Sequence, residues 1–355
     1  MKSVFVLGDG QLSYMLYLAG KPLDIKVYPI SLSDKYIKLP MHADVITTEI
    51  ESWPSSIFIN KLINNPAFIN RDIFPILSDR LKQKKILNQL KLATSPWRLL
   101  QDKSEWPQIL SLLGHPVIVK CRTGGYDGHR QWCLHNYNDT ALLEDKYYGQ
   151  CIVEKKIDFI EEISLIGARN QKGNMVFYPL TCNFHQSGIL RTSIVLPKVN
   201  RELQQQAENM LSNIMHYIKY IGVMVMECFL TSQGLLINEL SPRVHNSGHW
   251  TQNGASISQF ELHLRAILGL PMPKPIVFSS SVMINLIGTN INFSWLEQPL
   301  VHLYWYGKEL RAGRKVGHLN LTDINQKRLL NAIHSLTPLL PQEYTSTITW
   351  ILAKL

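Results

Sequence analysis

The most informative stretch of this chain is Asn238-Glu-Leu-Ser-Pro-Arg243-Val-His245-Asn-Ser-Gly-His249, in which an apolar strand runs directly into a polar loop. The loop brings a guanidinium, two imidazoles, an amide and a hydroxyl together within nine residues. A single histidine at such a place is more often structural than functional. This density of polar groups after a buried strand instead predicts an anion-binding loop that stabilises the charge of a transition state.

A second apolar strand lies just upstream, and the two predict a β-hairpin made of residues 222–230 and 235–240. With Gln233 at its centre, Glu227 and Glu239 lie opposite each other, with Cβ atoms about 4.5–5.5 Å apart. Two carboxylates this close among apolar neighbours repel each other unless a cation joins them. Carboxylate oxygens suit Mg²⁺, which usually bridges to nucleotide phosphates. The alternative is a pair of solvated carboxylates on an exposed strand, and the apolar flanks argue against it.

A glycine-rich loop follows another predicted strand, at residues 117–120. That strand ends in Lys120, and the loop Thr123-Gly-Gly-Tyr-Asp-Gly128 comes directly after it. An ammonium group there can meet phosphates, and glycines let backbone N–H groups approach them closely. The loop is not a Walker sequence, because no Gly-Lys-Ser/Thr follows, so an ordinary glycine hairpin remains the alternative.

A basic turn lies near the C-terminus, at Lys308-Glu-Leu-Arg-Ala-Gly-Arg314-Lys315-Val-Gly-His318, between two predicted strands. Its clustered cations suit a phosphate clamp. A solvated hairpin is an equally plain interpretation of the same residues.

The N-terminus reads strand, glycine turn, helix and strand, which is typical of an open parallel sheet. The turn Gly8-Asp9-Gly10 suggests a phosphate at the start of the following helix. However, the third glycine of a dinucleotide fingerprint would fall at Ser13, and the second strand ends Tyr28-Pro-Ile30 without a carboxylate for a ribose. A dinucleotide-dependent oxidoreductase therefore has little support.

Composition bounds the class of protein. The chain has 355 residues, 45% hydrophobic and 18% charged, which predicts two or three packed domains. No apolar run approaches the roughly 20 residues of a membrane span. Five scattered cysteines without a CxxC pair predict reduced thiols, no zinc site and a cytoplasmic protein.

The net charge of +9 favours either a nucleic-acid partner or phosphorylated anions as substrates. The densest basic runs, at residues 80–85 and 311–315, are short and do not repeat. Nucleic acid is therefore the weaker hypothesis, and small anions are the stronger one.

Together these motifs resemble the ATP-grasp superfamily and, within it, the N5-carboxyaminoimidazole ribonucleotide synthetase family of purine biosynthesis. The most specific segments are Arg122-Thr-Gly-Gly-Tyr-Asp-Gly128, residues 238–249 and Gly313-Arg-Lys-Val-Gly-His318. The resemblance implies an α/β and α+β protein with the ATP-grasp fold. Its parts would be an N-terminal Rossmann-like open parallel sheet (1–95), a small ATP-lid domain (96–178) and a C-terminal ATP-grasp domain with a β-rich end (179–355).

The resemblance also implies the activity, which is the ATP-dependent carboxylation of 5-aminoimidazole ribonucleotide with bicarbonate. The products would be N5-carboxyaminoimidazole ribonucleotide, ADP and phosphate, formed through carboxyphosphate, and the implied cofactors are ATP and Mg²⁺. The enzymes of the family are commonly homodimers. Neither a nucleic-acid partner nor a membrane is implied.

The family's site residues carry over to this sequence by position. ATP would be bound by Arg80, Lys120, Gly124, Gly125, Tyr126, Asp127, Gly128, Val153, Glu154, Glu162, His185, Asn238 and Glu239. Mg²⁺ would be held by Glu227 and Glu239, and Arg243, His245, Asn246 and Ser247 would surround bicarbonate and carboxyphosphate. The ribonucleotide would be bound by Tyr126, Asp127, Asn246, Ser247, Lys308, Arg314 and Lys315.

Asp127, Arg243 and His245 are the candidate catalytic residues. Asp127 is expected to orient the substrate amine or to accept its proton. The variant Asp127→Ala is therefore expected to abolish carboxylation while ATP binding stays measurable. Loss of ATP binding in that variant would contradict this role.

The sequence departs from the family pattern at two places. The family's glycine loop continues Gly-Arg-Gly, whereas this chain has Gly128-His129-Arg130. The N-terminal turn of the family reads Gly-Gln-Leu-Gly-Arg-Met, whereas this chain has Ser13-Tyr14 in place of Gly-Arg. Another ATP-grasp ligase remains an alternative, and it would differ from this chain at residues 243–249 and 308–318.

Overall fold

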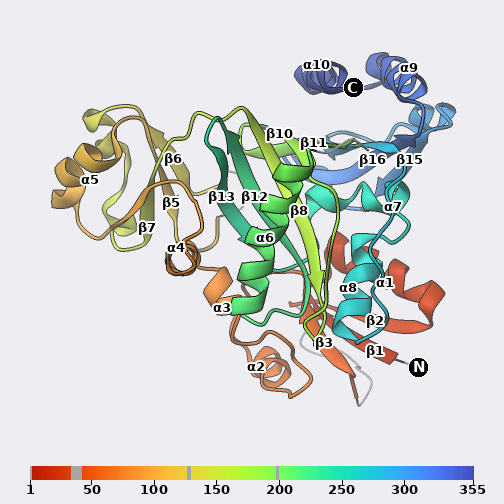
Figure 1. Cartoon of the computed structure of the whole chain (residues 1–355), viewed down its shortest axis with the longest axis horizontal. Helices are drawn as coiled ribbons and strands as arrows, with labels where there is room; N and C mark the ends of the chain where they lie inside the picture. The colour runs from red at the N-terminus through yellow and green to blue at the C-terminus, as the bar shows by residue number, and fades with distance from the viewer. Residues whose placement is uncertain (1, 33–41, 126–128, 197–199) are drawn as a thin grey trace.

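The computed structural model describes residues 2–32, 42–125, 129–196 and 200–355. These residues form three β-sheets, which lie in three parts of the molecule (Figure 1). The first sheet is parallel, and the other two are antiparallel. The predicted combination of an α/β N-terminal part with α+β parts is confirmed. Within the described residues, no helix has both the length and the apolar character that a bilayer crossing requires.

The N-terminal sheet has the strand order β2-β1-β3. Its strands and the helices that accompany it are β1 (Lys2–Leu7), α1 (Gln11–Gly20), β2 (Ile25–Ile30), β3 (Val45–Thr48), α2 (Ile57–Ile63), α3 (Phe74–Leu77) and α4 (Arg80–Gln89). The predicted order of strand, glycine turn, helix and strand is present as β1, α1 and β2. The carboxyl ends of β1 and β3 meet at one edge of the sheet, where open parallel sheets bind their ligands.

The helix α4 leads from the N-terminal sheet into the next part of the chain. Its first turn is capped by Asp79, whose side chain accepts a hydrogen bond of 2.9 Å from the backbone N–H of Leu81. The same carboxylate forms a 2.6 Å ion pair with Arg122, which precedes the glycine-rich loop. Arg80, the first residue of α4, is thereby placed beside that loop.

The small antiparallel sheet has the strand order β4-β7-β5-β6. Its elements are β4 (Trp97–Leu100), α5 (Trp106–Leu113), β5 (Val117–Cys121), β6 (Gln131–Leu134) and β7 (Cys151–Lys155). The apolar stripe of α5, which includes the fully buried Trp106, packs against the inward-facing residues of this sheet. The strand β5 pairs antiparallel with β6, and the glycine-rich loop connects the two.

The large sheet follows the order β13-β12-β8-β10-β11-β14-β16-β15, with β9 beside β8. Its strands are β8 (Glu161–Arg169), β9 (Met175–Phe177), β10 (Thr181–Gln186), β11 (Ile189–Val195), β12 (Gly222–Thr231), β13 (Gly234–Ser241), β14 (Ser280–Ile287), β15 (Val301–Trp305) and β16 (Lys315–Asp323). Its helices are α6 (Arg201–Tyr217), α7 (Thr251–Gly254), α8 (Gln259–Ile267), α9 (Gln326–Leu336) and α10 (Thr345–Lys354). Short 3-10 helices occur at Lys21–Leu23, Lys103–Glu105, Tyr137–Leu142, Asp145–Tyr147, Asn246–Gly248, Phe293–Glu297, Thr337–Leu339 and Gln342–Tyr344.

Both faces of the large sheet are covered because its central strands are apolar on both sides. Along β12, Met224 and Met226 face the core under α6, which crosses the sheet in Figure 1. Val223 and Val225 alternate with them and face the core under α8 and α1. The period-2 alternation of a strand thus distributes one apolar run between two cores. The α1 side of the second core holds the N-terminal sheet against the large sheet.

The boundary between the two C-terminal parts differs from the predicted one. The prediction assigned residues up to 178 to the small domain, but β8 and β9 pair within the large sheet. The small sheet ends with β7 at Lys155, and β8 begins at Glu161. We propose 96–156 as the small domain. The strand β8 belongs to the large domain because it pairs with β12 of the large sheet, although it follows the small sheet closely in the sequence.

The predicted β-hairpin is present, and its register places Glu227 opposite Glu239 as expected. Nearer the turn the register shifts by one, so that Cys228 pairs with Ile237. The residue left over is Asn238, which forms a β-bulge. A bulge re-aims the side chains on either side of it, and here it lies between the large sheet and the small one.

A buried histidine joins the N-terminal sheet to the large sheet. His263 of α8 accepts a hydrogen bond at Nδ1 from the backbone N–H of Val223, at 3.1 Å, and its Nε2 lies 3.5 Å from Thr47 Oγ1. Burial lowers the pKa of His263 to about 4. The folded protein therefore holds this ring neutral at a pH at which the unfolded chain protonates it.

This lowered pKa predicts acid destabilisation between pH 6.5 and pH 4. Because the unfolded chain binds the proton first as the pH falls, the contribution of His263 to the free energy of unfolding is fully present above pH 6.5. Below pH 6.5 this contribution falls by about 1.4 kcal/mol per pH unit. The free energy of unfolding in urea is measured at pH 7.5 and at pH 5.5. Between these two values it is expected to fall by about 1.4 kcal/mol less in His263→Gln than in wild type. The exposed His302 supplies the control variant His302→Gln. Equal losses in wild type and His263→Gln would contradict the prediction.

Candidate functional site

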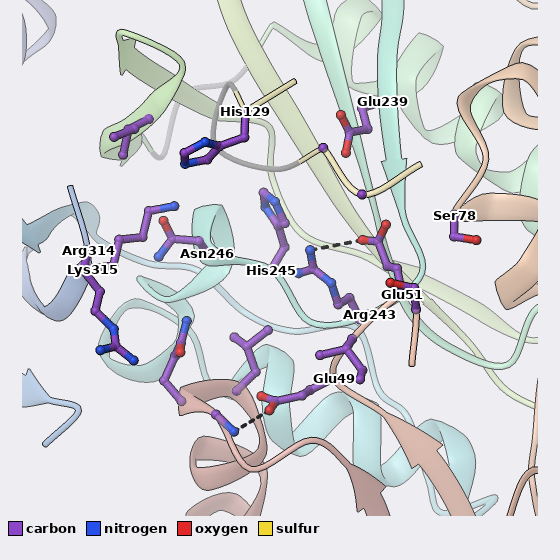
Figure 2. A pocket seen from close by; sticks show the side chains of 18 of the residues that line it. Glu49, Glu51, Ser78, His129, Glu239, Arg243, His245, Asn246, Arg314 and Lys315 are labelled. Carbon is purple, nitrogen blue, oxygen red and sulfur yellow. Dashed lines mark hydrogen bonds and ion pairs between the residues drawn. The ribbon is translucent and has the colours of Figure 1, made fainter. Parts of the chain in front are cut away.

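Two adjoining cavities lie where the three sheets meet. The large cavity has a volume of about 1110 Å³ and is lined by residues of the N-terminal sheet, the glycine loop and the basic turn. The small cavity, of about 520 Å³, lies between the small sheet and the large sheet. We call the residues that line both cavities the junction; among the described residues they are Arg80, His129, Glu239, Arg243, His245, Asn246 and Lys315. Figure 2 shows most of them around one space.

The small cavity combines cations with an apolar wall. Arg80 donates hydrogen bonds to the backbone oxygens of Cys121, at 2.9 Å, and Gly125, at 3.2 Å. Phe159 and Phe229 lie on the same cavity and stack with ring centroids 4.8 Å apart. A flat apolar surface beside fixed cations suits an aromatic base that carries phosphates. The two phenylalanines were not predicted from the sequence.

Glu154 lines the small cavity, and its carboxylate forms ion pairs with two lysines. Lys120 Nζ lies 2.7 Å from one oxygen and Lys84 Nζ 2.8 Å from the other. Burial alone would raise the pKa of Glu154, but the two ammonium groups outweigh it and lower that pKa to about 2. The neighbouring Val153, also predicted to bind ATP, packs in the core of the small sheet and is not part of the cavity wall.

Glu162 and His185 lie together on the other side of the small cavity. His185 Nδ1 is 2.7 Å from Glu162 Oε2, because β8 and β10 are adjacent strands. Burial alone would lower the pKa of His185, but the bond to Glu162 and the nearby Glu227 raise it overall. The structure thus brings these two predicted residues into one charged pair.

Glu227 and Glu239, the carboxylates predicted to bind a metal, lie opposite each other on β12 and β13. Burial and the neighbouring Glu239 raise the pKa of Glu227 to about 7, even though His185 opposes the shift. Glu239 forms a 3.3 Å ion pair with Arg80. Asn238, at the bulge, accepts a 3.0 Å hydrogen bond from Lys120. No group of three or more His, Cys, Asp or Glu side chains within the described ranges is arranged to hold a metal.

The polar loop after β13 is held by contacts from several elements. Arg243 forms a 3.1 Å ion pair with Glu51, which follows β3 of the N-terminal sheet (Figure 2). His245 Nδ1 lies 3.0 Å from Ser247 Oγ, and its Nε2 lies 3.6 Å from Glu227. Burial, reinforced by the charge of Arg243, lowers the pKa of His245 well below its usual range. His245 is therefore a neutral ring at the junction.

Asn246 and Ser247, both predicted to bind substrate, lie differently relative to the cavities. Asn246 lines both cavities and is held by paired hydrogen bonds of 2.9 and 2.5 Å with the buried Asn285 of β14. Ser247 is fully buried and accepts a hydrogen bond from Ser164 of β8 at 3.1 Å. The structure places Ser247 behind the wall, where it supports His245, and not on the cavity surface.

The basic turn forms the wall of the large cavity that faces the N-terminal sheet. Lys308, Arg314 and Lys315, the residues predicted to form a phosphate clamp, all line this cavity. Lys308 Nζ donates a hydrogen bond to Gln11 Oε1 at the start of α1. The turn lies between β15 and β16, which pair antiparallel as expected.

The N-terminal glycine turn is filled by a carboxylate of the chain itself. Glu49, which follows β3, accepts hydrogen bonds from the backbone N–H groups of Gly10 and, at 2.8 Å, Ser13. A Cβ on Gly8 would lie 2.5 Å from the side chain of Glu49. The start of α1 thus binds an internal anion where a dinucleotide would place its phosphates, which removes the main support for an oxidoreductase.

The glycine loop is described only in part. Gly124 and Gly125 line the large cavity, and a Cβ on Gly125 would lie 2.8 Å from the guanidinium of Arg80. Tyr126, Asp127 and Gly128, which were predicted to bind ATP or the ribonucleotide, lie outside the described residues. His129 lies at the junction, and Arg130 has a φ of +55°, in the left-handed region where the family pattern has glycine.

Besides the two phenylalanines, Glu49, Glu51 and Lys84 escaped prediction from the sequence. Glu49 and Glu51 stand just after a strand of a parallel sheet, and the ends of such strands form a ligand crevice. Lys84 is four residues after Arg80 on α4, so both face the same way. These signals were present in the sequence, but partners such as Arg243 and Glu154 come from distant segments.

Two family models match the chain. The ATP-grasp domain matches residues 85–260, and the phosphoribosylaminoimidazole carboxylase C-terminal domain matches residues 281–332. The chain is also similar over its length to the N5-carboxyaminoimidazole ribonucleotide synthase of Escherichia coli (strain K12). The two are 58% identical over 354 residues, which cover 100% of this chain and 99% of that protein.

Solved structures give the same similarity. The N5-carboxyaminoimidazole ribonucleotide synthetase of Thermus thermophilus matches with a TM-score of 0.86 and 32% identity, covering 96% of this chain and 99% of that one. The N5-carboxyaminoimidazole synthetase of Staphylococcus aureus, solved in complex with ADP, matches with a TM-score of 0.85 and 27% identity. That match covers 94% of this chain and 96% of that one.

Proposed function

This chain belongs to the N5-carboxyaminoimidazole ribonucleotide synthase family, and we propose that it carboxylates 5-aminoimidazole ribonucleotide with bicarbonate in an ATP-dependent reaction of purine biosynthesis. The observation that supports this most directly is the junction, where a nucleotide-sized cavity opens into a larger one beside Arg243 and His245. Two cavities that share one wall suit a reaction in which a group passes from a nucleotide to a second substrate.

The small cavity is the site proposed for ATP. Phe159 and Phe229 provide an apolar surface for the base, and Glu162 lies on the same wall for the ribose. Arg80 and Lys120 lie at the end nearer the junction and are the cations proposed for the phosphates. Bound ATP supplies the phosphoryl group that turns bicarbonate into carboxyphosphate, with ADP as the leaving group.

Arg243 is proposed to hold bicarbonate and then the carboxyphosphate formed from it. Its guanidinium can bind an oxyanion through parallel N–H donors. His245 is held neutral by burial and by Arg243, so it acts as a hydrogen-bond partner at the junction rather than as a second cation. Asn246, fixed by Asn285, is positioned to donate to the same anion. Exclusion of water from the space around Arg243 and Asn246 would protect the labile carboxyphosphate from hydrolysis.

Glu227 and Glu239 fit the Mg²⁺ that the family implies. The two carboxylates face each other, and burial together with Glu239 raises the pKa of Glu227, which a bound cation would oppose. The amide oxygen of Asn238, which accepts a hydrogen bond from Lys120, would be a third hard ligand beside them. A bound Mg²⁺ would neutralise phosphate charge during transfer.

The large cavity is the site proposed for the ribonucleotide. Lys308, Arg314 and Lys315 are the cations proposed for its phosphate, and Arg311 lines the same wall. Tyr126 and Asp127 remain predictions for the aminoimidazole, with Asp127 orienting the amine or accepting its proton. The amine then attacks the carboxyl carbon, and phosphate leaves. A homodimer and a cytoplasmic location also remain predictions.

The test is ADP release measured with bicarbonate and 5-aminoimidazole ribonucleotide, each omitted in turn. Full activity is expected only when both are present, with one ADP released for each carboxylated product. Formate or an amino acid in place of bicarbonate tests the alternative of another ATP-grasp ligase. Absence of ADP release above background with both substrates, in a protein that binds ADP, would overturn the proposed function.

A further inference from the structure

A buried lysine that belongs to none of the assigned ligand sets stands behind the nucleotide cavity. Lys84 is the fifth residue of α4, and only 3% of its side chain is exposed. A lysine is almost never buried to this degree unless its charge is compensated. Its ammonium group does not line either cavity, so a direct contact with substrate does not account for it.

Lys84 is one member of a cluster of three charges. Its Nζ lies 2.8 Å from Glu154 Oε1, while Lys120 Nζ lies 2.7 Å from Glu154 Oε2. Only 3% of the Glu154 side chain and 12% of the Lys120 side chain are exposed. The carboxylate therefore lies between two ammonium groups, one facing the cavity and one facing away from it.

Three segments of the chain meet in this cluster. Lys84 comes from α4, whereas Glu154 and Lys120 come from the paired strands β7 and β5 of the small sheet. Lys84 also donates a 2.6 Å hydrogen bond to Thr94 Oγ1, which in turn donates to the backbone oxygen of Ile237 on β13. Lys84 is thus fixed relative to both sheets that enclose the nucleotide cavity.

The helix α4 is itself held in one position. Gln83, the residue before Lys84, exchanges hydrogen bonds with the backbone of Leu240 on β13, at 3.1 and 3.2 Å. Arg80, one turn earlier on the same face, lies on the cavity wall. One rigid helix therefore places a cation on the wall and another behind it.

The sum of charges in the cluster explains why two lysines surround one carboxylate. Glu154 holds Lys120 in place, but a carboxylate alone would cancel the charge that Lys120 presents to a phosphate. With Lys84 the cluster carries a net charge of +1, and Lys120 is the cation of the cluster that lines the cavity. Without Lys84 the cluster would be neutral, and a buried neutral pair attracts an anion weakly.

We propose that Lys84 is a positioning residue for the nucleotide: it neutralises Glu154, so that Glu154 can orient Lys120 without cancelling its charge toward the phosphates. This inference rests on the proposed ATP site and assigns Lys84 no contact with substrate. Lys84, Glu154 and Lys120 then form one electrostatic unit. Removing the charge of Lys84 weakens nucleotide binding, and removing the charge of Glu154 as well restores it.

The test is the affinity for ADP, measured by isothermal titration calorimetry on four proteins: wild type, Lys84→Met, Glu154→Gln and the double variant. Lys84→Met makes the cluster neutral and is expected to weaken ADP binding about 10- to 100-fold. The double variant regains a net charge of +1 and is expected to lie within about fivefold of wild type. Lys85→Met, which removes an exposed lysine from the same helix, is the matched control and is expected to change nothing.

The double variant separates this role from a merely structural one. If Lys84 only held the helix to the small sheet, removing Glu154 as well would leave ADP binding as weak as in Lys84→Met or weaker, and that result would overturn the proposal. ADP affinity within about threefold of wild type in Lys84→Met would overturn it too. Should Lys84→Met fail to fold, Glu154→Gln and the double variant are compared instead. Burial lowers the pKa of Lys84 and Glu154 opposes that shift, so without Glu154 the buried lysine is expected to be neutral and both variants carry a net charge of +1. Equal ADP affinity in the two variants supports the proposal, and a large difference contradicts it.

ADP binding also keeps this test separate from that of the proposed function. A wild-type protein that binds ADP but does not carboxylate 5-aminoimidazole ribonucleotide would refute the function and leave the Lys84 comparison intact. A protein that carboxylates normally, with ADP affinity unaffected by Lys84→Met, would refute only the role of Lys84.

Discussion

Replacing Arg243 by alanine is expected to lower bicarbonate-dependent ADP release about 10³-fold, which is the scale for removing a preorganised donor from a developing anion. Arg243 lines both cavities, and its ion pair with Glu51 and its 3.2 Å hydrogen bond to the backbone oxygen of Val244 orient the guanidinium. These contacts engage two of its five N–H donors, and the planar group can therefore present others to an oxyanion. Steady-state ADP release with varied bicarbonate measures the effect.

ADP binding is expected to stay within about threefold of wild type in Arg243→Ala, because the cations proposed for the phosphates remain. The variant leaves the partly buried Glu51 without its partner beside the cavity, where desolvation already raises its pKa although Arg243 opposes the shift. The double variant Glu51→Gln/Arg243→Ala removes that unpaired carboxylate and controls for loss of stability. Retention of more than a tenth of wild-type activity in a folded Arg243→Ala protein would show that the anion is held elsewhere.

Replacing Glu239 by glutamine is expected to lower the maximal rate about 10²- to 10³-fold and to raise the Mg²⁺ concentration needed for half of it. Glutamine keeps the size of the side chain but removes the charge that opposes Glu227 across the hairpin. Burial raises the pKa of Glu227 to about 7 and the neighbouring Glu239 adds to the shift, so a cation between the two carboxylates would favour their charged forms. A titration of ADP release with Mg²⁺ at saturating ATP measures both effects.

Two comparisons sharpen this experiment. Glu202→Gln removes an exposed carboxylate from α6 and is expected to leave the Mg²⁺ titration unchanged. In Glu227→Gln/Glu239→Gln, the rate is expected to fall no further than about tenfold below the single variant, because both carboxylates act on one ion. An Mg²⁺ dependence in Glu239→Gln equal to that of wild type would contradict the assignment of Glu239 as a metal ligand.

The local elements were predictable because their signals lie within short stretches of sequence. The strand predicted at residues 117–120 is β5, and the predicted hairpin of residues 222–230 and 235–240 is formed by β12 and β13. The resemblance to the family is confirmed by the family models and by the 58% identical relative. The pairing of Glu227 with Glu239 was also correct, although it depends on a bulge at Asn238 that the sequence did not indicate.

The parts that could not be predicted depend on contacts between distant segments. The strand β8 looks like a strand of the small domain until its partner β12, far along the chain, is known. Ser247 belongs to the polar loop by sequence, yet packing against Ser164 turns it away from the cavity. The helix α10 at the C-terminus was not predicted at all, and its apolar residues pack into the core beside α9.

The sequence by itself determined which chemical groups this protein brings to its site: the carboxylate pair, the polar loop after β13, the glycine loop and the basic turn. These are local, because a strand, a turn and the side chains that follow them are set by neighbouring residues. The tertiary structure decided which groups face each other across the cavities. Glu51 meets Arg243, and Lys84 meets Glu154, only because buried charges must find partners and the packed sheets bring those partners within 3.1 Å.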